Sequence, residues 1–128
     1  MRDITVTIQI NKPLPDVFAF TINPKNTSLY VDSILVEETN EWPVKKGSIY
    51  RNKRKNSEWS EYEITEFKEN ELFELRKKDA DTVVRYTFKP IAKLITELEY
   101  YVKMEVGELD EASIKKIVEK LKAVLERN

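Results

Sequence analysis

The sequence predicts an α+β domain in which a curved antiparallel sheet wraps around one long C-terminal helix. Three patterns lead to this fold class. Residues 4–10 alternate apolar and polar side chains, as a half-buried strand does. Further segments rich in β-branched and aromatic residues follow, separated by short turns. From residue 110 onward the apolar spacing changes to that of an amphipathic helix.

The N-terminal part predicts a strand followed by two short helices. Residues 4–10 place four β-branched side chains on one face. Pro15 suits the first turn of a helix, where its missing N–H costs nothing. Asn23 and Pro24 then have the types preferred at the N-cap and first position of a second helix, which we expect to end near Tyr30.

The middle of the chain predicts six successive strands, which should form an antiparallel meander with one solvated face. Turns are expected around Trp42-Pro43 and at the polar segments 56–57, 68–70 and 79–81. The expected strands are Ile34–Thr39, Ser48–Lys55, Trp59–Phe67, Leu72–Lys77, Val83–Lys89, which Pro90 should end, and Ile95–Met104.

The C-terminal segment predicts a helix of about 18 residues, near 27 Å long at 1.5 Å per residue. Asp110 is a good N-cap, and Leu109 and Ile114 have the spacing of a hydrophobic staple around it, after a change of pattern at Gly107. The apolar side chains fall on one face of this helix. They are Ile114, Ile117, Val118, Leu121, Val124 and Leu125.

The composition indicates one domain, residues 1–128, and excludes several functions. The chain has 128 residues, 41% hydrophobic and 35% charged, with a net charge of −1. This balance favours neither nucleic acid nor an anionic membrane as a partner. There is no cysteine or histidine, which excludes disulfides and thiolate catalysis and makes a metal site unexpected. We expect no cofactor. With no signal peptide pattern and no apolar run of about 20 residues, we expect a cytoplasmic protein without membrane insertion.

Several local patterns, in order over the whole chain, resemble one known group. They are Ile8, Ile10, Pro13, Val17 and Phe18 followed by residues 23–26, then Gly47, residues 62–67 (YEITEF), residues 86–90 (YTFKP) and residues 121–126 (LKAVLE). This series resembles the START-like superfamily, which includes polyketide cyclase/dehydrase proteins, lipid-transport proteins and the major birch pollen allergen. The resemblance implies a helix-grip fold with a cavity for an apolar ligand between the sheet and the terminal helix.

This resemblance, together with strand alternation, gives a set of candidate ligand-binding residues. Tyrosine suits such a site because it combines apolar area with a hydroxyl group. The alternative is a filled core in which each hydroxyl group reaches the rim or a carbonyl. Arg54 shares a face with Tyr50 and Asn52, and on the concave face it would hold a carboxylate or phosphate group. The candidates are Tyr50, Arg54, Tyr62, Tyr86, Phe88, Leu98, Tyr100, Ile117 and Leu121.

The leading hypothesis is a non-enzymatic protein that binds or transports a small hydrophobic or amphipathic molecule, such as a lipid or polyketide. One alternative is a polyketide cyclase or dehydratase. If the strand register slips, Glu38 or Glu61 would line the concave side of such an enzyme as a general base; otherwise we expect both to be surface glutamates. No catalytic set is assigned. Another alternative is a module that binds a chaperone or ribosomal partner through Trp42 and Trp59. Apart from Arg54, we expect the basic run at residues 51–55 (Arg51, Lys53 and Lys55) to be a solvated face neutralised by Glu58, Glu61 and Glu63.

Overall fold

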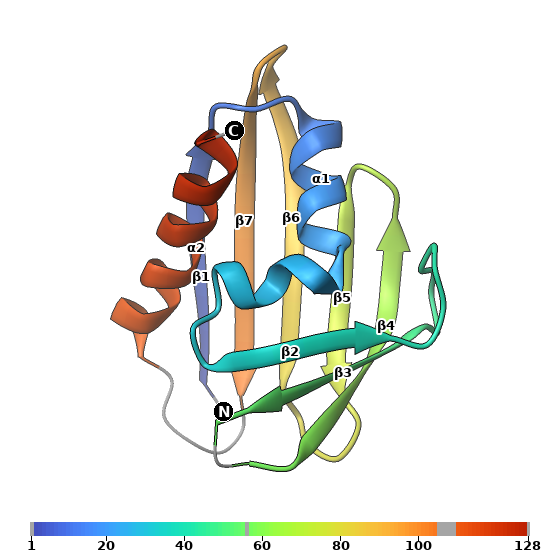
Figure 1. The fold of residues 1–128 in the computed structure, drawn as a ribbon. Helices are drawn as coiled ribbons and strands as arrows, with labels where there is room; N and C mark the ends of the chain where they lie inside the picture. The colour runs from blue at the N-terminus through green and yellow to red at the C-terminus, as the bar shows by residue number, and fades with distance from the viewer. Residues whose placement is uncertain (1, 56, 105–109, 128) are drawn as a thin grey trace.

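The computed structural model describes residues 2–55, 57–104 and 110–127, and Figure 1 shows their fold. The predicted α+β class and the predicted order of elements are confirmed. The elements are β1 (Arg2–Ile10), α1 (Leu14–Ile22), the 3-10 helix η1 (Pro24–Leu29), β2 (Ile34–Thr39), β3 (Ile49–Arg54), β4 (Trp59–Lys68), β5 (Leu72–Lys77), β6 (Val83–Ala92), β7 (Ile95–Met104) and α2 (Glu111–Glu126).

All seven strands belong to one antiparallel sheet in the order β1-β7-β6-β5-β4-β3-β2. The meander from β2 to β7 therefore pairs each strand with its neighbour in sequence, and β1 closes against β7. In Figure 1 the helices α1, η1 and α2 lie on the same face of the sheet, and β2 and β3 curl around below them. The concave face is thus enclosed by helices and by the bend of the sheet itself.

The predicted caps of the helical segments are confirmed. The side chain of Asn23 accepts a hydrogen bond from the backbone N–H of Lys25 at 3.0 Å. The side chain of Asp110 accepts one from the N–H of Ala112 at 3.1 Å and starts α2. Each bond satisfies a helix-terminal N–H that would otherwise lack a partner. The predicted staple through Leu109, the change at Gly107 and the turn at Asn56 lie outside the described residues.

Several strand ends differ from those expected by one or two residues, and two boundary differences affect the fold more. The helix α2 has 16 residues, about half a turn fewer than expected. The strand β6 continues past Pro90 to Ala92, whereas Pro90 was expected to end it. Pairing of β6 with β5 extends only to Thr87, and the N–H of Phe88 still donates to the carbonyl oxygen of Glu71 at 2.7 Å. Pro90 lies beyond these bonds, where β6 is paired with β7 alone. A proline is tolerated there because its missing N–H breaks no bond on the other side.

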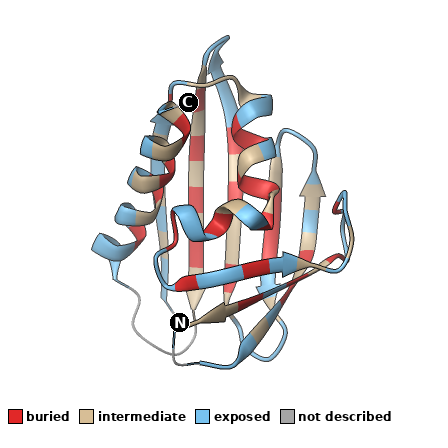
Figure 2. Cartoon of the chain, in the orientation of Figure 1, coloured by how far each residue is buried: buried red, intermediate tan, exposed pale blue. Residues whose placement is uncertain are grey.

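Burial follows the two faces of the sheet. Figure 2 shows buried residues alternating along β6 and β7 and gathered on the faces of α1 and α2 that turn toward the sheet. One part of this interior is closed by aromatic packing around Phe18 of α1. The ring centroid of Phe18 lies 5.3 Å from that of Phe88 and 5.9 Å from that of Phe73, in edge-to-face contacts. No helix within the described residues is long and apolar enough to cross a membrane.

Candidate functional site

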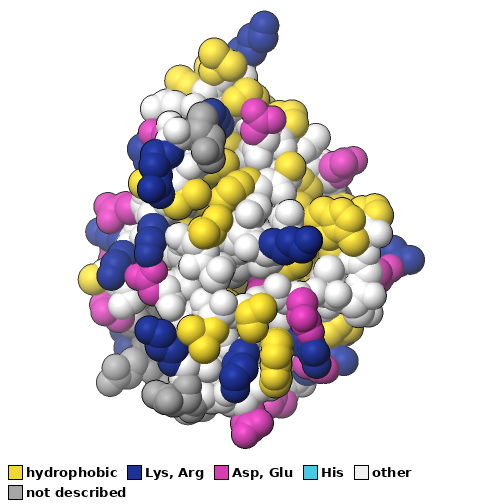
Figure 3. Space-filling model, in the orientation of Figure 1, with side chains coloured by type: hydrophobic (Ala, Val, Ile, Leu, Met, Phe, Trp, Pro, Cys, Tyr) yellow, Lys and Arg dark blue, Asp and Glu magenta, His cyan; other side chains and the backbone are white. Residues whose placement is uncertain are grey.

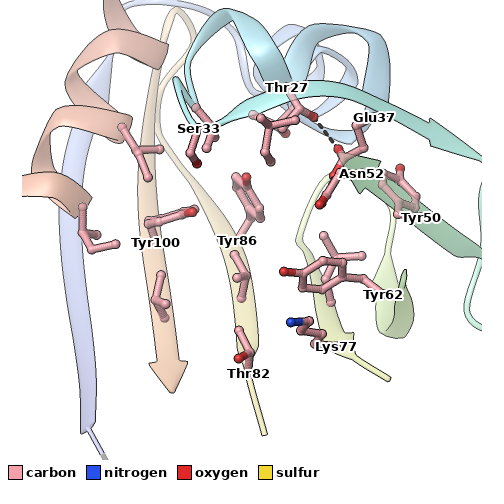
Figure 4. Close-up of a pocket in the computed structure, with 18 of the residues that line it drawn as sticks. Thr27, Ser33, Glu37, Tyr50, Asn52, Tyr62, Lys77, Thr82, Tyr86 and Tyr100 are labelled. Carbon is pink, nitrogen blue, oxygen red and sulfur yellow. Dashed lines mark hydrogen bonds between the residues drawn. The ribbon is translucent and has the colours of Figure 1, made fainter. Parts of the chain in front are cut away.

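A cavity of about 500 Å³ lies beside this packed region, between the sheet and the helices η1 and α2. Its size is within the range of small-molecule sites, roughly 300–1,000 Å³. Figure 4 shows side chains from β2, β3, β5, β6 and β7 turned toward one space. Six of the nine predicted site residues line it: Tyr50, Arg54, Tyr62, Tyr86, Tyr100 and Ile117.

The other three predicted residues are not in the cavity lining. Phe88, Leu98 and Leu121 are 3%, 0% and 0% exposed and belong to the closed core. Phe88 and Leu98 are paired across β6 and β7, two residues along from the pair formed by Tyr86 and Tyr100. Their side chains point to the same face as the tyrosines but lie where Phe18 fills the interior.

A buried carboxyl group that sequence reasoning did not select faces this cavity. Glu37 of β2 is 9% exposed. Its Oε1 accepts a hydrogen bond from Thr27 Oγ1 at 2.6 Å, and its Oε2 accepts one from Asn52 Nδ2 at 3.0 Å. All three residues line the cavity, and Figure 4 shows them together at one side of it. We call Thr27, Glu37 and Asn52 the polar cluster.

An irregularity in β2 explains why Glu37, and not Glu38, faces inward. Ile34 is paired with Arg54, but the next pair is Val36 with Lys53, so Leu35 is an extra residue in β2. A bulge of this kind reverses which face the following residues occupy. Ile34 and Glu37 are therefore both buried. The sequence signal that could have revealed this is the apolar run Ile34-Leu35-Val36, which does not alternate.

Both glutamates considered as catalytic candidates lie outside the cavity. Glu38 forms an ion pair with Arg51, and its side chain is about half exposed. Glu61 is exposed and pairs with Lys78 at 3.5 Å. The expected position of both residues on the surface is therefore confirmed, and the alternative in which one of them lines the concave side is wrong. The bulge turns Glu38 outward, and β4 keeps Glu61 on its solvated face.

Burial controls the protonation of the polar cluster. Desolvation raises the pKa of Glu37, while hydrogen bonds from Thr27 and Asn52 and the charge of Arg54 oppose that shift. No basic side chain forms an ion pair with Glu37 in the part of the chain that the structure describes. A carboxyl group held only by neutral donors has both the position and the environment to interact with a ligand.

Four buried tyrosines surround the cavity or its border, and burial raises the pKa of each: Tyr30, Tyr50, Tyr86 and Tyr100, the last to about 12. They therefore stay protonated at neutral pH. Tyr50 donates its hydroxyl proton to the carbonyl oxygen of Ile22. The hydroxyl oxygens of Tyr30 and Tyr86 are 3.4 Å apart. A tyrosine hydroxyl group can both donate and accept, so Tyr86 and Tyr100 suit several kinds of ligand.

Arg54 lines the cavity as a half-buried cation. Its Nη1 donates to Ser33 Oγ, and Lys77 is a second cation in the lining. The arrangement expected from the sequence, with Arg54 on the face of Tyr50 and Asn52, is found in the structure. Across residues 2–55, 57–104 and 110–127, no group of three or more acidic side chains is placed to hold a metal ion.

The two tryptophans lie outside the cavity. Trp42 is 59% exposed and Trp59 is 42% exposed. The guanidinium carbon of Arg51 lies 4.4 Å from the ring centroid of Trp59, so this ring is covered in part by a cation.

No protein-family model matches the sequence, and no curated protein does. Solved structures, in contrast, match over nearly the whole chain. A START superfamily protein from Mycobacterium smegmatis has a TM-score of 0.80 at 10% identity, covering 98% of this chain and 97% of that one. This chain has the START-like helix-grip fold. The resemblance seen in the sequence is thus confirmed for the fold.

Two further structures show the range of proteins with this START-like fold. The di-domain ARO/CYC protein StfQ from the steffimycin biosynthetic pathway has a TM-score of 0.77 at 12% identity, covering 97% of this chain and 44% of that one. The Aha1 dimer from Colwellia psychrerythraea has a TM-score of 0.72 at 13% identity, covering 98% and 97%. At such identities the likeness establishes the fold and leaves the function to be argued from the site.

Proposed function

We propose that this START-like chain, taken as one domain, binds a small amphipathic molecule in the cavity between the sheet and α2. The observation that carries this function is a space of about 500 Å³ with mostly apolar walls and a buried polar cluster at one side. Apolar walls supply most of the binding free energy, and a few fixed polar groups orient the ligand. The neighbouring START-like structures, which include an ARO/CYC protein, support a ligand-binding role.

Six side chains are proposed as ligand contacts because they line the cavity: Tyr50, Arg54, Tyr62, Tyr86, Tyr100 and Ile117. Glu37 and Asn52 join them as polar contacts. The proposed role of Phe88, Leu98 and Leu121 changes from contact to support, since they pack in the filled part of the interior beside the cavity. Polar lining comes from the helical side too, through Thr27 of η1 and Ser113 of α2, so the helices contribute more than apolar area.

The direct test is a thermal-shift and native mass spectrometry screen against fatty alcohols, fatty acids, naphthols, flavonoids and quinones. We expect at least one class to raise the melting temperature and to form a one-to-one complex. A variant Ile117→Trp, which fills the cavity, should lose this stabilisation. Glu119→Trp adds the same bulk at an exposed position of α2 and should keep it. Equal loss in both variants, or no stabilisation by any class, would contradict ligand binding in the cavity.

A second candidate function is an enzyme of the cyclase or dehydratase kind. The observation that favours it is Glu37, a carboxyl group in the cavity whose pKa is raised by burial, because such a group keeps its proton to higher pH than an ordinary carboxyl group and can serve as a general acid or base. Incubation with a reactive poly-β-ketone and analysis of the products would test it. Conversion that Glu37→Gln abolishes, with binding retained, would make the protein an enzyme. If there is no conversion above the uncatalysed background, ligand binding remains as the proposed function.

The third possibility, a protein-interaction module, has exposed Trp42 as its main support. On the face shown in Figure 3 basic and acidic side chains are interspersed, so no single charge would steer a partner to it. A pull-down that depends on Trp42 and succeeds without any small molecule would favour this function over the first two.

A further inference from the structure

Tyr62 of β4 and Lys77 of β5 form a second polar pair in the cavity lining. The two residues are partners in the antiparallel ladder of β4 and β5, and both line the cavity. Directly paired residues place their side chains on the same face of a sheet, within reach of one another. Figure 4 shows both side chains at the end of the space away from Glu37 and Asn52. The cavity therefore has a polar site separate from the polar cluster, of which the sequence predicted only Tyr62.

The hydroxyl group of Tyr62 is open to the cavity. Among the described residues this hydroxyl group has no hydrogen-bond partner. Asn52 Oδ1 is the one fully buried side-chain nitrogen or oxygen without a partner in the same part of the chain, so the hydroxyl oxygen of Tyr62 is not fully buried. Because Tyr62 lines the cavity, a ligand there can reach its hydroxyl group.

The ammonium group of Lys77 is only weakly neutralised. Its Nζ lies 3.9 Å from Oδ1 of Asp79, whose side chain is 83% exposed. An ion pair with so exposed a partner contributes little. Within the part of the chain that the structure describes, Nζ of Lys77 makes no shorter ion pair and no hydrogen bond. The side chain of Lys77 is 30% exposed, so its stem lies against the cavity wall while its charge keeps unused donors.

An apolar row leads from this pair across the sheet toward α2. Leu75, Val84 and Val102 are paired across β5, β6 and β7, and all three line the cavity. Leu75 is two residues before Lys77 and therefore shares its face of β5. At about 4.8 Å between neighbouring strands, the row extends over about 10 Å. A cation and a hydroxyl group at one end of such a row suit a ligand with a single polar end.

We propose that the cavity binds amphipathic carboxylates, with the carboxylate group beside Lys77 and Tyr62 and the apolar part along Leu75, Val84 and Val102. This inference rests on the ligand binding proposed above and adds the chemical class. A carboxylate has two oxygens and one charge, so it can accept from the ammonium group and from the hydroxyl group at once. An amide of the same shape can accept from the same donors but gains little from the charge of Lys77.

The experiment compares matched ligands by isothermal titration calorimetry at neutral pH and low salt. The pairs are naphthoic acid with naphthamide, and octanoic acid with octanamide. We expect each acid to bind the wild-type protein at least about fivefold more tightly than its amide, because charge-assisted hydrogen bonds are the stronger ones. High salt should reduce this preference.

Lys77→Met keeps the apolar stem of the side chain and should bring the ratio of the two affinities to about one. The matched control is Lys78→Met. It removes the same charge from the neighbouring residue, which is exposed and pairs with Glu61 at 3.5 Å outside the cavity. The ratio should therefore stay at its wild-type value in the control. Lys77→Arg keeps the charge and should also retain the preference for acids.

Tyr62→Phe tests the position of the carboxylate group. This variant removes only the hydroxyl group, and acid and amide each present an oxygen to it. Both affinities should therefore fall by a similar factor, about threefold or more. If all four affinities are unchanged in Tyr62→Phe, the polar end of the ligand does not lie beside Tyr62.

The outcomes separate the two proposals. Equal affinity of acid and amide for the wild-type protein overturns the preference for carboxylates and leaves ligand binding intact. A preference that survives Lys77→Met, or that Lys78→Met removes equally, overturns the role of Lys77. Absence of binding by all four compounds overturns both the class of ligand and the proposed function.

Discussion

The interior of this protein has two ends that use the same structural elements differently. At one, the filled end, Phe18 packs against Phe88 while Leu98 and Leu121 are completely buried. At the other, the open end, Tyr86, Tyr100 and Ile117 line a cavity of about 500 Å³. A step of two residues along β6 or β7, or of one turn along α2, leads from one end to the other.

The difference arises from what covers the sheet at each end. The helix α1 packs against β6 and β7 and fills the first end with Val17 and Phe18. The cover at the second end is η1, a short 3-10 helix that turns Thr27 inward and packs against β2. Threonine is too small to fill the space that a phenylalanine fills. Position along an element, and not only the face it presents, therefore decides whether a side chain packs or lines a site.

The largest expected effect contrasts Leu121 with Ile117 on α2. Leu121→Ala should lower the free energy of unfolding by about 2–5 kcal/mol, because it leaves a void in close-packed surroundings. Ile117→Ala should cost clearly less, about 1 kcal/mol, because Ile117 is half-buried and already faces open space. Urea denaturation of both variants measures the difference.

Alanine variants of equal cost would remove the distinction between the two ends. A larger loss for Ile117→Ala would show that α2 packs at the open end as tightly as at the filled one.

An intermediate effect contrasts two buried glutamates, Glu37 in the cavity and Glu74 on the outer face of the sheet. Glu74 accepts hydrogen bonds from Thr65 and Arg85, each at 2.8 Å, and from Arg76 at 3.1 Å. Burial alone would raise the pKa of Glu74, but these bonds and the charge of Arg85 lower it. Glu74→Gln should cost about 1–2 kcal/mol at neutral pH, because the two arginines lose a charged partner but remain hydrated.

Stability should depend on pH with opposite signs at these two residues. The raised pKa of Glu37 means that its contribution to stability is lost as pH rises above the ordinary value of 4.5. The lowered pKa of Glu74 means that its contribution is lost as pH falls below 4.5. The free energy of unfolding of Glu37→Gln should therefore increase relative to that of the wild type as pH rises. The loss of stability caused by Glu74→Gln should become smaller as pH falls. Denaturation of both variants and the wild type between pH 3 and 8 tests these expectations. If the stability difference from the wild type changed with pH in the same direction for both variants, the opposite pKa shifts of Glu37 and Glu74 would be contradicted.

The smallest expected effect concerns Arg54 at the cavity. If an anionic group binds there, Arg54→Gln should lower the affinity for naphthoic acid by no more than about fivefold, because Arg54 is only half-buried. The affinity for naphthol should be unchanged within error. The difference should diminish at high salt. Calorimetry at low and high salt provides the measurement, and an equal loss for both ligands would mean that Arg54 supports the fold and not an anion.

Most of the fold could be predicted from the sequence because its signals are local. Alternation at residues 4–10, the caps Asn23 and Asp110, and the apolar face of α2 each depend on neighbours in the chain. The candidate site was predicted in part. Alternation identified the inward face and with it Tyr86 and Tyr100. It could not show that α1 closes the same face at Phe88, since that depends on a contact between residues 70 positions apart.

Glu37 was missed for a related reason. The bulge at Leu35 is set by the pairing of β2 with β3, and a single extra residue moves Glu37 inward and Glu38 outward. The sequence of one strand does not specify its register with the neighbouring strand. The irregular apolar run at residues 34–36 is the local trace of this bulge, and it becomes informative only once the partner strand is known.

The most direct test is to locate a bound ligand by nuclear Overhauser effects to methyl groups of labelled protein. With naphthol bound, we expect contacts from Ile114 and Ile117 of α2 and Val102 of β7, which line the open end. Ile10, Leu98 and Leu121, which are completely buried and do not line the cavity, should show none. Contacts with these three residues, or only with exposed residues such as Leu94, would contradict a ligand site at the open end.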